Sequence, residues 1–180
     1  MHKNIPLSPT ISITAIASVS PLGNESETIW NKYQNPNPCF QSRFLDQKET
    51  WCGPLDEDSK AQVAALRQSD IKYKYLDNSV LYAMLASRKA IVKAGWSKND
   101  VFGINIGSSR GATDLFEQHF QEYITTGKAQ TLASPTTTLG NISSWVAHDL
   151  QTDGPEISHS ITCSTALHAV LNGVAWLRSG

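Results

Sequence analysis

The sequence has few cysteines, no excess of either charge and no long apolar run. Its three cysteines are an odd number without a C-x-x-C pair, which argues against a disulfide framework and a zinc knuckle and predicts a reducing, cytoplasmic environment. Neither Cys39 nor Cys52 has a histidine or a third cysteine at ligand spacing, so no metal site is expected.

The balance of charge and the absence of a long apolar run also exclude two classes of partner. There are 15 lysines and arginines against 16 aspartates and glutamates, so charge gives no reason to expect a nucleic acid or an anionic membrane. No stretch approaches the roughly 20 apolar residues of a membrane-spanning helix. The partner of this protein must therefore be selected by a local site.

Length and hydrophobic content predict one packed domain over residues 1–180. A hydrophobic fraction of 40% with five tryptophans argues against disorder, and this length suits a single domain. Residues 39–54 are polar and aromatic without a regular period, so we expect a loop or insertion at about residues 35–70.

The N-terminal segment is either an export signal or a strand. Residues 10–18 are mildly apolar and contain an Ala-Ile-Ala tripeptide that resembles a signal-peptidase site. Only Lys3 is basic ahead of it, and Ser12 and Thr14 interrupt the apolar residues with the alternation of a strand. We therefore predict a first strand over residues 11–17.

Two helices are predicted in the first half of the sequence. The first is capped by Asn24 or Ser26 and is ended by the Asn-Pro-Asn-Pro segment at residues 35–38. The second lies within residues 76–94, where apolar side chains recur at helical spacing, and Gly95 supplies its stop.

The second half predicts strands that alternate with helices. A short apolar run at residues 101–107 is typical of a strand buried on both faces of a parallel sheet, and a helix begins near Ala112. Residues 139–150 are helical in pattern, and a strand through Ile161 is followed by a helix through Leu177. This alternation indicates βαβ units and an α/β layered fold.

The most informative segment is residues 154–170, which read as a tight turn, a strand and then Cys163 at the start of a helix. The exposed amides and the dipole at a helix N-terminus favour a thiolate over a thiol. The same amides can hold a developing oxyanion in the transition state. Cys163 is therefore a candidate nucleophile.

From the residues alone, a second interpretation of Cys163 is a buried side chain that packs like a small hydrophobe. A cysteine hydrolase would need a nearby histidine base. His168 lies five positions along the helix and points about 140° away from Cys163. His159 alternates on the strand with Ile157 and Ile161 on one face. We interpret both histidines as packing, surface or interface residues.

A glycine-rich turn between strand and helix is a second candidate site. Gly103, Gly107 and Gly111 lie around the Ser-Ser-Arg segment at residues 108–110, where a phosphate could be cradled. The turn has neither a Gly-Lys-Ser/Thr motif nor a G-x-G-x-x-G motif. We interpret it as a structural turn.

Residues 154–170 resemble the nucleophile region of β-ketoacyl synthases, which are thiolase-fold condensing enzymes. Those enzymes typically show Gly-Pro, a strand, a Thr-x-Cys-like step, small residues and an apolar helix. The Val-Ser-Pro-Leu-Gly motif at residues 19–23 resembles the opening turn of the family, and residues 76–95 its long helix with an Ala-Gly ending. Residues 104–111 resemble the strand of the family with its small-residue loop. Residues 134–148 resemble the segment that precedes the nucleophile strand.

Together these matches cover residues 7 to about 20 and 76–180, whereas residues 39–70 match only loosely. Two features depart from the family pattern. The opening glycines of the family appear here as Ala15 and Ala17, and the small residue that usually precedes the cysteine is Thr162.

The resemblance implies an α/β, thiolase-like layered αβα fold, of which this sequence holds the first half in βαβαβα order, without the final strands. It implies that Cys163 accepts an acyl group as a thioester, for decarboxylative condensation with malonyl-acyl carrier protein in fatty acid or polyketide-type synthesis. No cofactor is expected, since acyl groups arrive on the phosphopantetheine of acyl carrier protein or of CoA. By the same resemblance Thr137, Thr138 and Asn141 lie near the acyl pocket, with a plain capped helix start as the alternative.

Family members complete the reaction with two histidines, or a histidine and an asparagine, and with a lysine and a glycine-rich loop from the second half of the fold. The sequence ends at Gly180, so we expect part of a longer acyltransferase that is inactive by itself. Uncovered apolar faces favour a homodimer or a heterodimer with a related synthase subunit. The candidate contact residues are Val146, Leu150, Ile157 and Ile161. The alternative function is a non-catalytic acyl-binding or dimerising subunit of the same fold.

Overall fold

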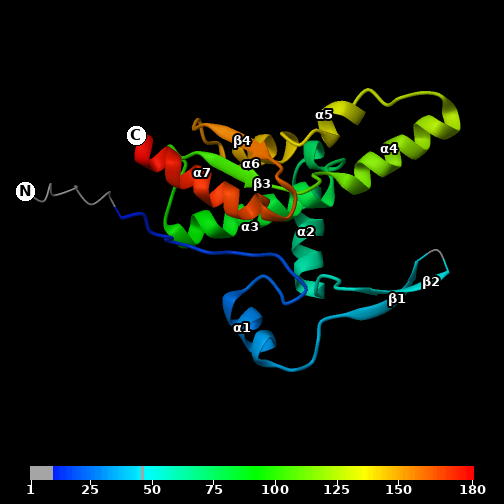
Figure 1. Cartoon of the computed structure of the whole chain (residues 1–180), viewed down its shortest axis with the longest axis horizontal. Coiled ribbons are helices and arrows are strands. Elements are labelled where there is room, and N and C mark those ends of the chain that lie inside the picture. The colour runs from blue at the N-terminus through cyan, green and yellow to red at the C-terminus, as the bar shows by residue number, and fades with distance from the viewer. Residues whose placement is uncertain (1–9, 46) are drawn as a thin grey trace, which may run out of the picture. The chain divides into compact units, whose positions relative to one another are not determined.

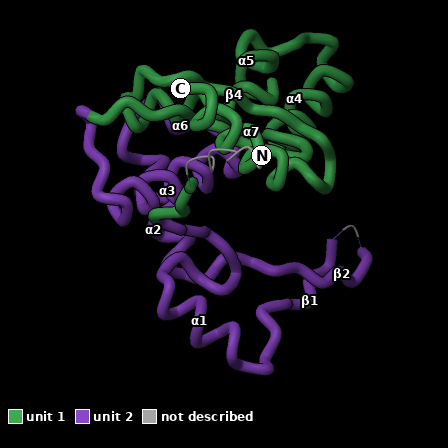
Figure 2. The backbone as a smooth tube through the Cα atoms, turned by 60° about the vertical axis from the view of Figure 1, so that its left-hand side comes forward, with its two compact units in different colours: residues 1–14, 100–180 green, residues 15–99 purple. Residues whose placement is uncertain are grey.

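The computed structural model describes residues 10–45 and 47–180, and the chain divides into two compact units. One unit comprises residues 15–99, and the other comprises residues 1–14 and 100–180 (Figure 2). Residues 7–9, where the family resemblance begins, and Lys3 lie outside the described residues. Each unit has its own buried apolar side chains.

The unit of residues 15–99 contains three α-helices, a β-hairpin and a short 3-10 turn (Figure 1). Its elements are α1 (Ser26–Gln34), β1 (Gln41–Leu45), β2 (Lys48–Cys52), α2 (Glu57–Ser69), η1 (Ile71–Tyr73) and α3 (Asn78–Ala94). Helix α2 packs against α3. The apolar side chains buried in this unit are Val63, Leu66, Tyr73, Leu76, Val80, Leu81, Met84 and Leu85.

Helix α3 confirms the helix predicted for residues 76–94. The Asp77 carboxylate accepts a hydrogen bond from the Ser79 amide at 2.8 Å, which satisfies one of the free amides in the first turn. Gly95 ends the helix in the left-handed conformation with φ 72°, which glycine adopts without the clash of a Cβ atom.

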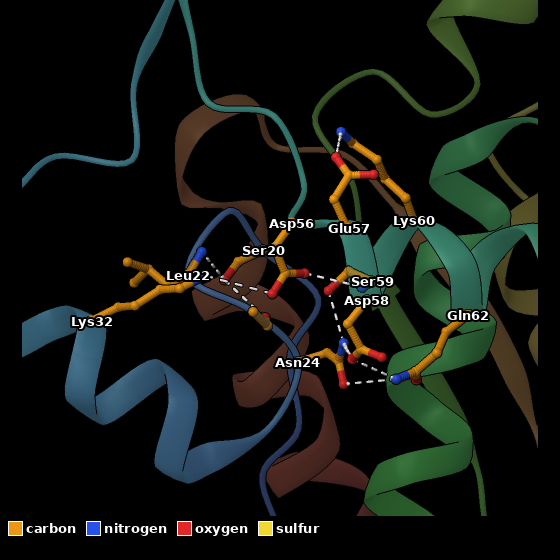
Figure 3. A network of polar contacts seen from close by, with 11 residues as sticks. Ser20, Leu22, Asn24, Lys32, Asp56, Glu57, Asp58, Ser59, Lys60 and Gln62 are labelled. Carbon is orange, nitrogen blue, oxygen red and sulfur yellow. Dashed lines mark hydrogen bonds and ion pairs between the residues drawn. The ribbon is translucent and has the colours of Figure 1, made fainter.

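The predicted cap of the first helix is wrong. Helix α1 has Glu25 at its N-cap position without a capping hydrogen bond to its side chain, and Ser26 is already its first residue. Asn24 is buried instead, and its Nδ2 donates to Asp58 Oδ2 at 2.9 Å and to Ser59 Oγ at 2.8 Å (Figure 3). Asn24 therefore does not cap α1, and its hydrogen bonds connect the turn before α1 to α2.

Residues 39–54, predicted as a loop or insertion, contain an antiparallel hairpin of β1 and β2. The pairing runs from Gln41 opposite Cys52 to Leu45 opposite Lys48, and most side chains of the hairpin are exposed. A strand shows alternating hydrophobicity only when one of its faces is buried. Because neither face of this hairpin is buried, its sequence shows no alternation of apolar and polar residues from which the strands could have been predicted.

The strand predicted for residues 11–17 is not formed. Residues 10–19 carry no helix or strand, and Ile13 and Ile16 are exposed. The alternation is present, but a strand needs a neighbouring backbone to pair with, and no strand of the described residues pairs with this segment. The turn that follows is confirmed, because Ser20 and Gly23 exchange both backbone hydrogen bonds, at 3.1 and 2.9 Å.

The second unit is a βαβ arrangement that continues into one more helix. Its elements are β3 (Ile104–Gly107), α4 (Thr113–Thr126), α5 (Ala133–Thr137), α6 (Asn141–Leu150), β4 (Glu156–His159), the 3-10 turn η2 (Thr162–Ser164) and α7 (Thr165–Ser179). Strands β3 and β4 are parallel, with Ile104 opposite Glu156 and Gly107 opposite His159. The predicted βαβ unit is confirmed.

Helices α6 and α7 cover opposite faces of the β3–β4 pair. Ser158 Oγ accepts a hydrogen bond from the Ser143 amide of α6 at 3.1 Å. Gly107 lies opposite His159, the residue of β4 that follows Ser158. A Cβ atom on Gly107 would meet the Thr165 carbonyl oxygen of α7 at 2.6 Å. Since successive strand residues face opposite sides, this part of the chain has helix, sheet and helix layers. The order along the whole chain differs from the predicted βαβαβα, because the first strand is absent and a hairpin intervenes.

One expected interface residue is placed differently from the prediction. Val146 is completely buried within its own unit, so its side chain is not available to a partner. Ile157 and Ile161 remain exposed. Within the described ranges, no helix has the length and hydropathy needed to cross a membrane.

Candidate functional site

Cys163 lies at the turn that joins β4 to α7, as the sequence predicted. It is the middle residue of η2 and its side chain is exposed, so within the described residues it is not packed as a buried apolar side chain. Cys39 and Cys52 are half-buried, and the Cys52 thiol donates to the Thr50 carbonyl of its own strand. Cys163 is thus the most accessible of the three thiols.

The backbone at this turn has an uncommon conformation. Thr162 has φ 50°, in the left-handed region that branched side chains rarely occupy. Its carbonyl oxygen accepts hydrogen bonds from the amide and the hydroxyl of Thr165. Ser109, in the loop after β3, adds a third bond from its Oγ at 3.0 Å. The chain therefore reverses sharply just before the thiol.

The amides of the first helical turn are only partly free to hold an oxyanion. The Ser164 amide donates to the Ile161 carbonyl at 3.4 Å, and the Thr165 amide donates to the Thr162 carbonyl. Among the hydrogen bonds of the described residues, none uses the amide of Cys163 itself. The amides of Ser164 and Thr165 are thus occupied, whereas the amide of the candidate nucleophile remains open to an oxyanion.

The two nearby histidines do not pair with Cys163 in this structure. His168 is half-buried and its Nδ1 lies 3.1 Å from the Ser164 carbonyl oxygen, one turn back along α7. His159 lies opposite Gly107 on the sheet face that α7 covers, and both of its ring nitrogens are buried without a hydrogen-bond partner among the described groups. Neither ring is placed to act as a base for the thiol.

Sequence reasoning missed a buried polar side chain close to His159. Asn105 lies two residues before Gly107 on β3, so it faces the same side of the sheet. Its amide oxygen and nitrogen are both buried, with no partner within the part of the chain that the structure describes. The signal was available, because an asparagine inside the apolar run of residues 101–107 is a polar exception in a buried strand.

The three residues expected near the acyl pocket lie at the junction of α5 and α6. Thr137 donates its hydroxyl to the Ala133 carbonyl at 2.6 Å, and the exposed Thr138 accepts a bond from the Asn141 amide at 3.0 Å. The Asn141 Nδ2 donates to the Thr136 carbonyl, while its Oδ1 is buried without a partner among the described residues. The structure brings Thr138 and Asn141 together at the start of α6, and the Thr137 hydroxyl is used within its own helix.

The glycines of the glycine-rich turn have packing and backbone roles. A Cβ atom on Gly103 would lie 2.9 Å from the Trp176 ring, and one on Gly107 would meet the backbone of Thr165. Gly111 has φ 69°, which glycine tolerates best. Gly103 and Gly107 let α7 approach the sheet closely. In residues 10–45 and 47–180, no three histidine, cysteine or acidic side chains are grouped so that they could hold a metal ion.

Comparison with known proteins assigns these features to one family. Residues 8–180 match the family described as Beta-ketoacyl synthase, N-terminal domain. Nodulation protein E of Rhizobium sp. (strain N33) is 24% identical over 179 residues, which are 94% of this chain and 44% of that protein. The 3-oxoacyl-[acyl-carrier-protein] synthase 2 of Coxiella burnetii is 25% identical over 173 residues, which are 89% of this chain and 40% of that protein. The chain thus spans less than half the length of these relatives.

Solved structures show the same fold. A β-ketoacyl synthase from Burkholderia phymatum STM815 superposes with a TM-score of 0.78 at 19% identity, over 93% of this chain and 43% of that one. A ketosynthase solved in complex with its type II polyketide acyl-carrier protein gives 0.71 at 14% identity, over 93% and 47%. A ketosynthase in complex with its chain length factor from Xenorhabdus doucetiae gives 0.60 at 19% identity, over 93% and 43%. With its sequence matched from residue 8 to residue 180, the chain belongs to the β-ketoacyl synthase family and corresponds to the N-terminal domain of that family.

Proposed function

We propose that this domain serves a β-ketoacyl-acyl carrier protein synthase in which Cys163 is the acyl-accepting nucleophile. The observation that carries the proposal is the exposed thiol in the turn between β4 and α7, in a chain that belongs to this family. A thiol kept only for packing has no need of exposure. A strand-to-helix turn also presents its side chain clear of the sheet and beside the N-terminus of a helix.

The proposed reaction has two covalent steps. In the first, Cys163 Sγ attacks the carbonyl carbon of an acyl thioester, the bond from that carbon to the carrier sulfur breaks, and the carrier leaves as a thiol with the proton that Cys163 has lost. In the second, a malonyl thioester loses carbon dioxide, and its α-carbon attacks the carbonyl carbon of the acyl group on Cys163. A carbon–carbon bond forms, the bond from that carbonyl carbon to Cys163 Sγ breaks, and the released thiolate takes up a proton from water.

The backbone amide of Cys163 is the group we assign to the oxyanion of the first step. It is not used by any hydrogen bond of the described residues. A backbone N–H that points at a developing negative charge stabilises the transition state without reorganising. Asn141 is retained as a candidate for the acyl pocket because its buried Oδ1 has no partner among the described residues, and Thr137 and Thr138 are proposed with it as neighbours in sequence.

The proposed partners follow from this reaction. Acyl groups would arrive on the phosphopantetheine of an acyl carrier protein or of CoA, and no further cofactor is needed. We propose that the protein works in the cytoplasm, in fatty acid or polyketide-type synthesis, as a dimer with an identical or a related subunit. A ketosynthase in complex with an acyl-carrier protein and another in complex with a chain length factor are among the structures with this fold.

Intact-protein mass spectrometry tests the nucleophile directly. The protein expressed from its complete gene is incubated with an acylated carrier protein, and we expect one added acyl group, located on the Cys163 peptide. The Cys163→Ala variant should gain no mass. The Cys52→Ala variant removes a half-buried thiol of the hairpin and should be acylated like the wild type.

The same experiment distinguishes the alternative function. A non-catalytic acyl-binding or dimerising subunit would bind the carrier or the acyl chain without forming a thioester. Unchanged mass in the wild type, or an acyl group that persists in Cys163→Ala, would contradict the role proposed for Cys163.

A further inference from the structure

Thr162, the residue immediately before Cys163, has a left-handed backbone conformation with φ 50°. A branched side chain clashes with the backbone in this region, so the conformation persists only where the surrounding structure holds it. The path of the chain through Thr162 determines where the next side chain points. The orientation of the Cys163 thiol therefore depends on the groups that hold Thr162.

Three hydrogen bonds converge on the carbonyl oxygen of Thr162. Two come from the amide and the hydroxyl of Thr165, a residue that is only 2% exposed. The same Thr165 hydroxyl accepts a bond from the Ile161 amide at 2.9 Å. The third comes from the Ser109 Oγ at 3.0 Å, and Ser109 lies in an exposed position after β3.

Ser109 is joined to the same turn by a second bond. Its carbonyl oxygen accepts a hydrogen bond from the Ser160 Oγ at 3.0 Å, so its two bonds span the segment from Ser160 to Thr162. The preceding residue, Ser108, uses its hydroxyl differently, because it accepts a bond from the Gly111 amide at 2.9 Å inside the loop. The hydroxyl of Ser109 thus bonds to the turn before Cys163, whereas the hydroxyl of Ser108 bonds within its own loop.

We propose that Ser109 is a positioning residue, which keeps Thr162 in the left-handed conformation and so aims the Cys163 thiol at the thioester of an incoming acyl carrier. The inference rests on the acyl transfer proposed above. The Ser109 hydroxyl acts through the Thr162 carbonyl oxygen. Without that bond the Thr162 carbonyl keeps only its two bonds from Thr165, so Thr162 leaves the left-handed conformation more often, and the sulfur spends less time in line with the carbonyl carbon it attacks.

The test compares Ser109→Ala with Ser109→Thr, which keeps a hydroxyl, and with Ser108→Ala as the matched control. Three quantities are measured on the protein expressed from its complete gene. They are the single-turnover rate of acyl transfer at saturating acylated carrier protein, the rate of Cys163 alkylation by iodoacetamide, and the melting temperature. Iodoacetamide is small and reaches an exposed thiol from many directions, so its rate reports exposure and not aim.

We expect Ser109→Ala to slow acyl transfer about three- to tenfold, the factor that one hydrogen bond contributes, with alkylation and melting temperature unchanged. Ser109→Thr should restore the rate, and Ser108→Ala should match the wild type. Equal transfer rates in wild type and Ser109→Ala would overturn the positioning role, as would a joint fall in both rates and in melting temperature. If the wild type accepts no acyl group at all, the proposed function itself fails, which is a different result from equal rates.

Discussion

Helices α3 and α7 are of similar length, 17 and 15 residues, but they are held in different ways within their units. Helix α3 is capped at both ends, and it buries Val80, Leu81, Met84 and Leu85. Helix α7 has no side-chain cap, and Thr165 is the one buried residue along its length. Several apolar side chains of α7 are exposed, among them Leu171 at 60%.

The difference shows two ways to fix a helix. Helix α3 is stabilised along its length by apolar burial, which is non-directional and tolerates small adjustments. Helix α7 is fixed at its first turn by directional bonds to Thr162 and by close contact with Gly107. Directional bonds set the position of a neighbouring side chain, and the candidate nucleophile lies at the end of α7 where they are concentrated.

The largest expected effect comes from removing apolar burial in α3. Met84 is 0% exposed, so Met84→Ala should lower the free energy of unfolding by about 2–5 kcal/mol through lost burial and a residual cavity. Leu171→Ala in α7 should change it by only about 0.5 kcal/mol, as is usual for an exposed side chain. Urea denaturation of both variants measures the contrast, and a similar loss in both would show that α7 is held by apolar burial after all.

An intermediate effect is expected at the contact between β3 and α7. A Cβ atom on Gly107 would lie 2.6 Å from the Thr165 carbonyl oxygen, and backbone atoms cannot move aside as a flexible side chain can. Gly107→Ala should therefore lower the free energy of unfolding by about 1–3 kcal/mol and slow acyl transfer to Cys163 by displacing the turn.

Gly140→Ala is the matched control for this prediction. Gly140 has φ −61°, and a Cβ atom there would meet nothing within 4 Å. The free energy of unfolding of the Gly140→Ala variant should be unchanged or higher by up to about 1 kcal/mol. Thermal denaturation and single-turnover acyl-transfer rates are compared for both variants, and equal behaviour of the two would disprove the close approach of α7 to β3.

The smallest effect concerns a polar bond at the start of α2, in the unit of α3. Asp56 caps α2 by accepting a bond from the Ser59 amide at 3.0 Å. Hydrogen bonding from Ser59, with a smaller contribution from Lys32, holds the pKa of the Asp56 carboxyl below its ordinary value. The folded state then gains stability from this carboxylate above about pH 4 and loses it as the pH falls through the lowered pKa.

Two substitutions of Asp56 separate the cap from the charge. Asp56→Ala should lose about 1 kcal/mol at pH 7, whereas Asp56→Asn keeps a capping oxygen and should lose less. The stability difference between wild type and Asp56→Asn should shrink as the pH is lowered from 5 to about 2, because the wild-type carboxyl becomes protonated. Urea midpoints across this range measure it, and a difference that is independent of pH would contradict the lowered pKa.

Local patterns were sufficient for the features that a short segment decides by itself. The helix from Asn78 to Ala94 was predictable because the apolar spacing lies within it and Gly95 directly follows it. The turn before α7 was predictable for the same reason, since strand, turn and helix signals follow one another within residues 154–170. Features that depend on a distant partner were not predictable in this way. The alternation of residues 11–17 is present without a strand, and the hairpin of β1 and β2 exists without the alternation.

By itself the sequence determined the family, the βαβ order of the second unit and the place of Cys163 at a strand-to-helix turn, because these follow from local periodicity and contiguous motifs. Only the tertiary structure decided that the thiol is exposed, that Asn105 and His159 are buried without partners, and that Ser109 reaches the Thr162 carbonyl from 53 positions away. The physical reason is that burial and side-chain hydrogen bonds join residues that are close in space and distant along the chain.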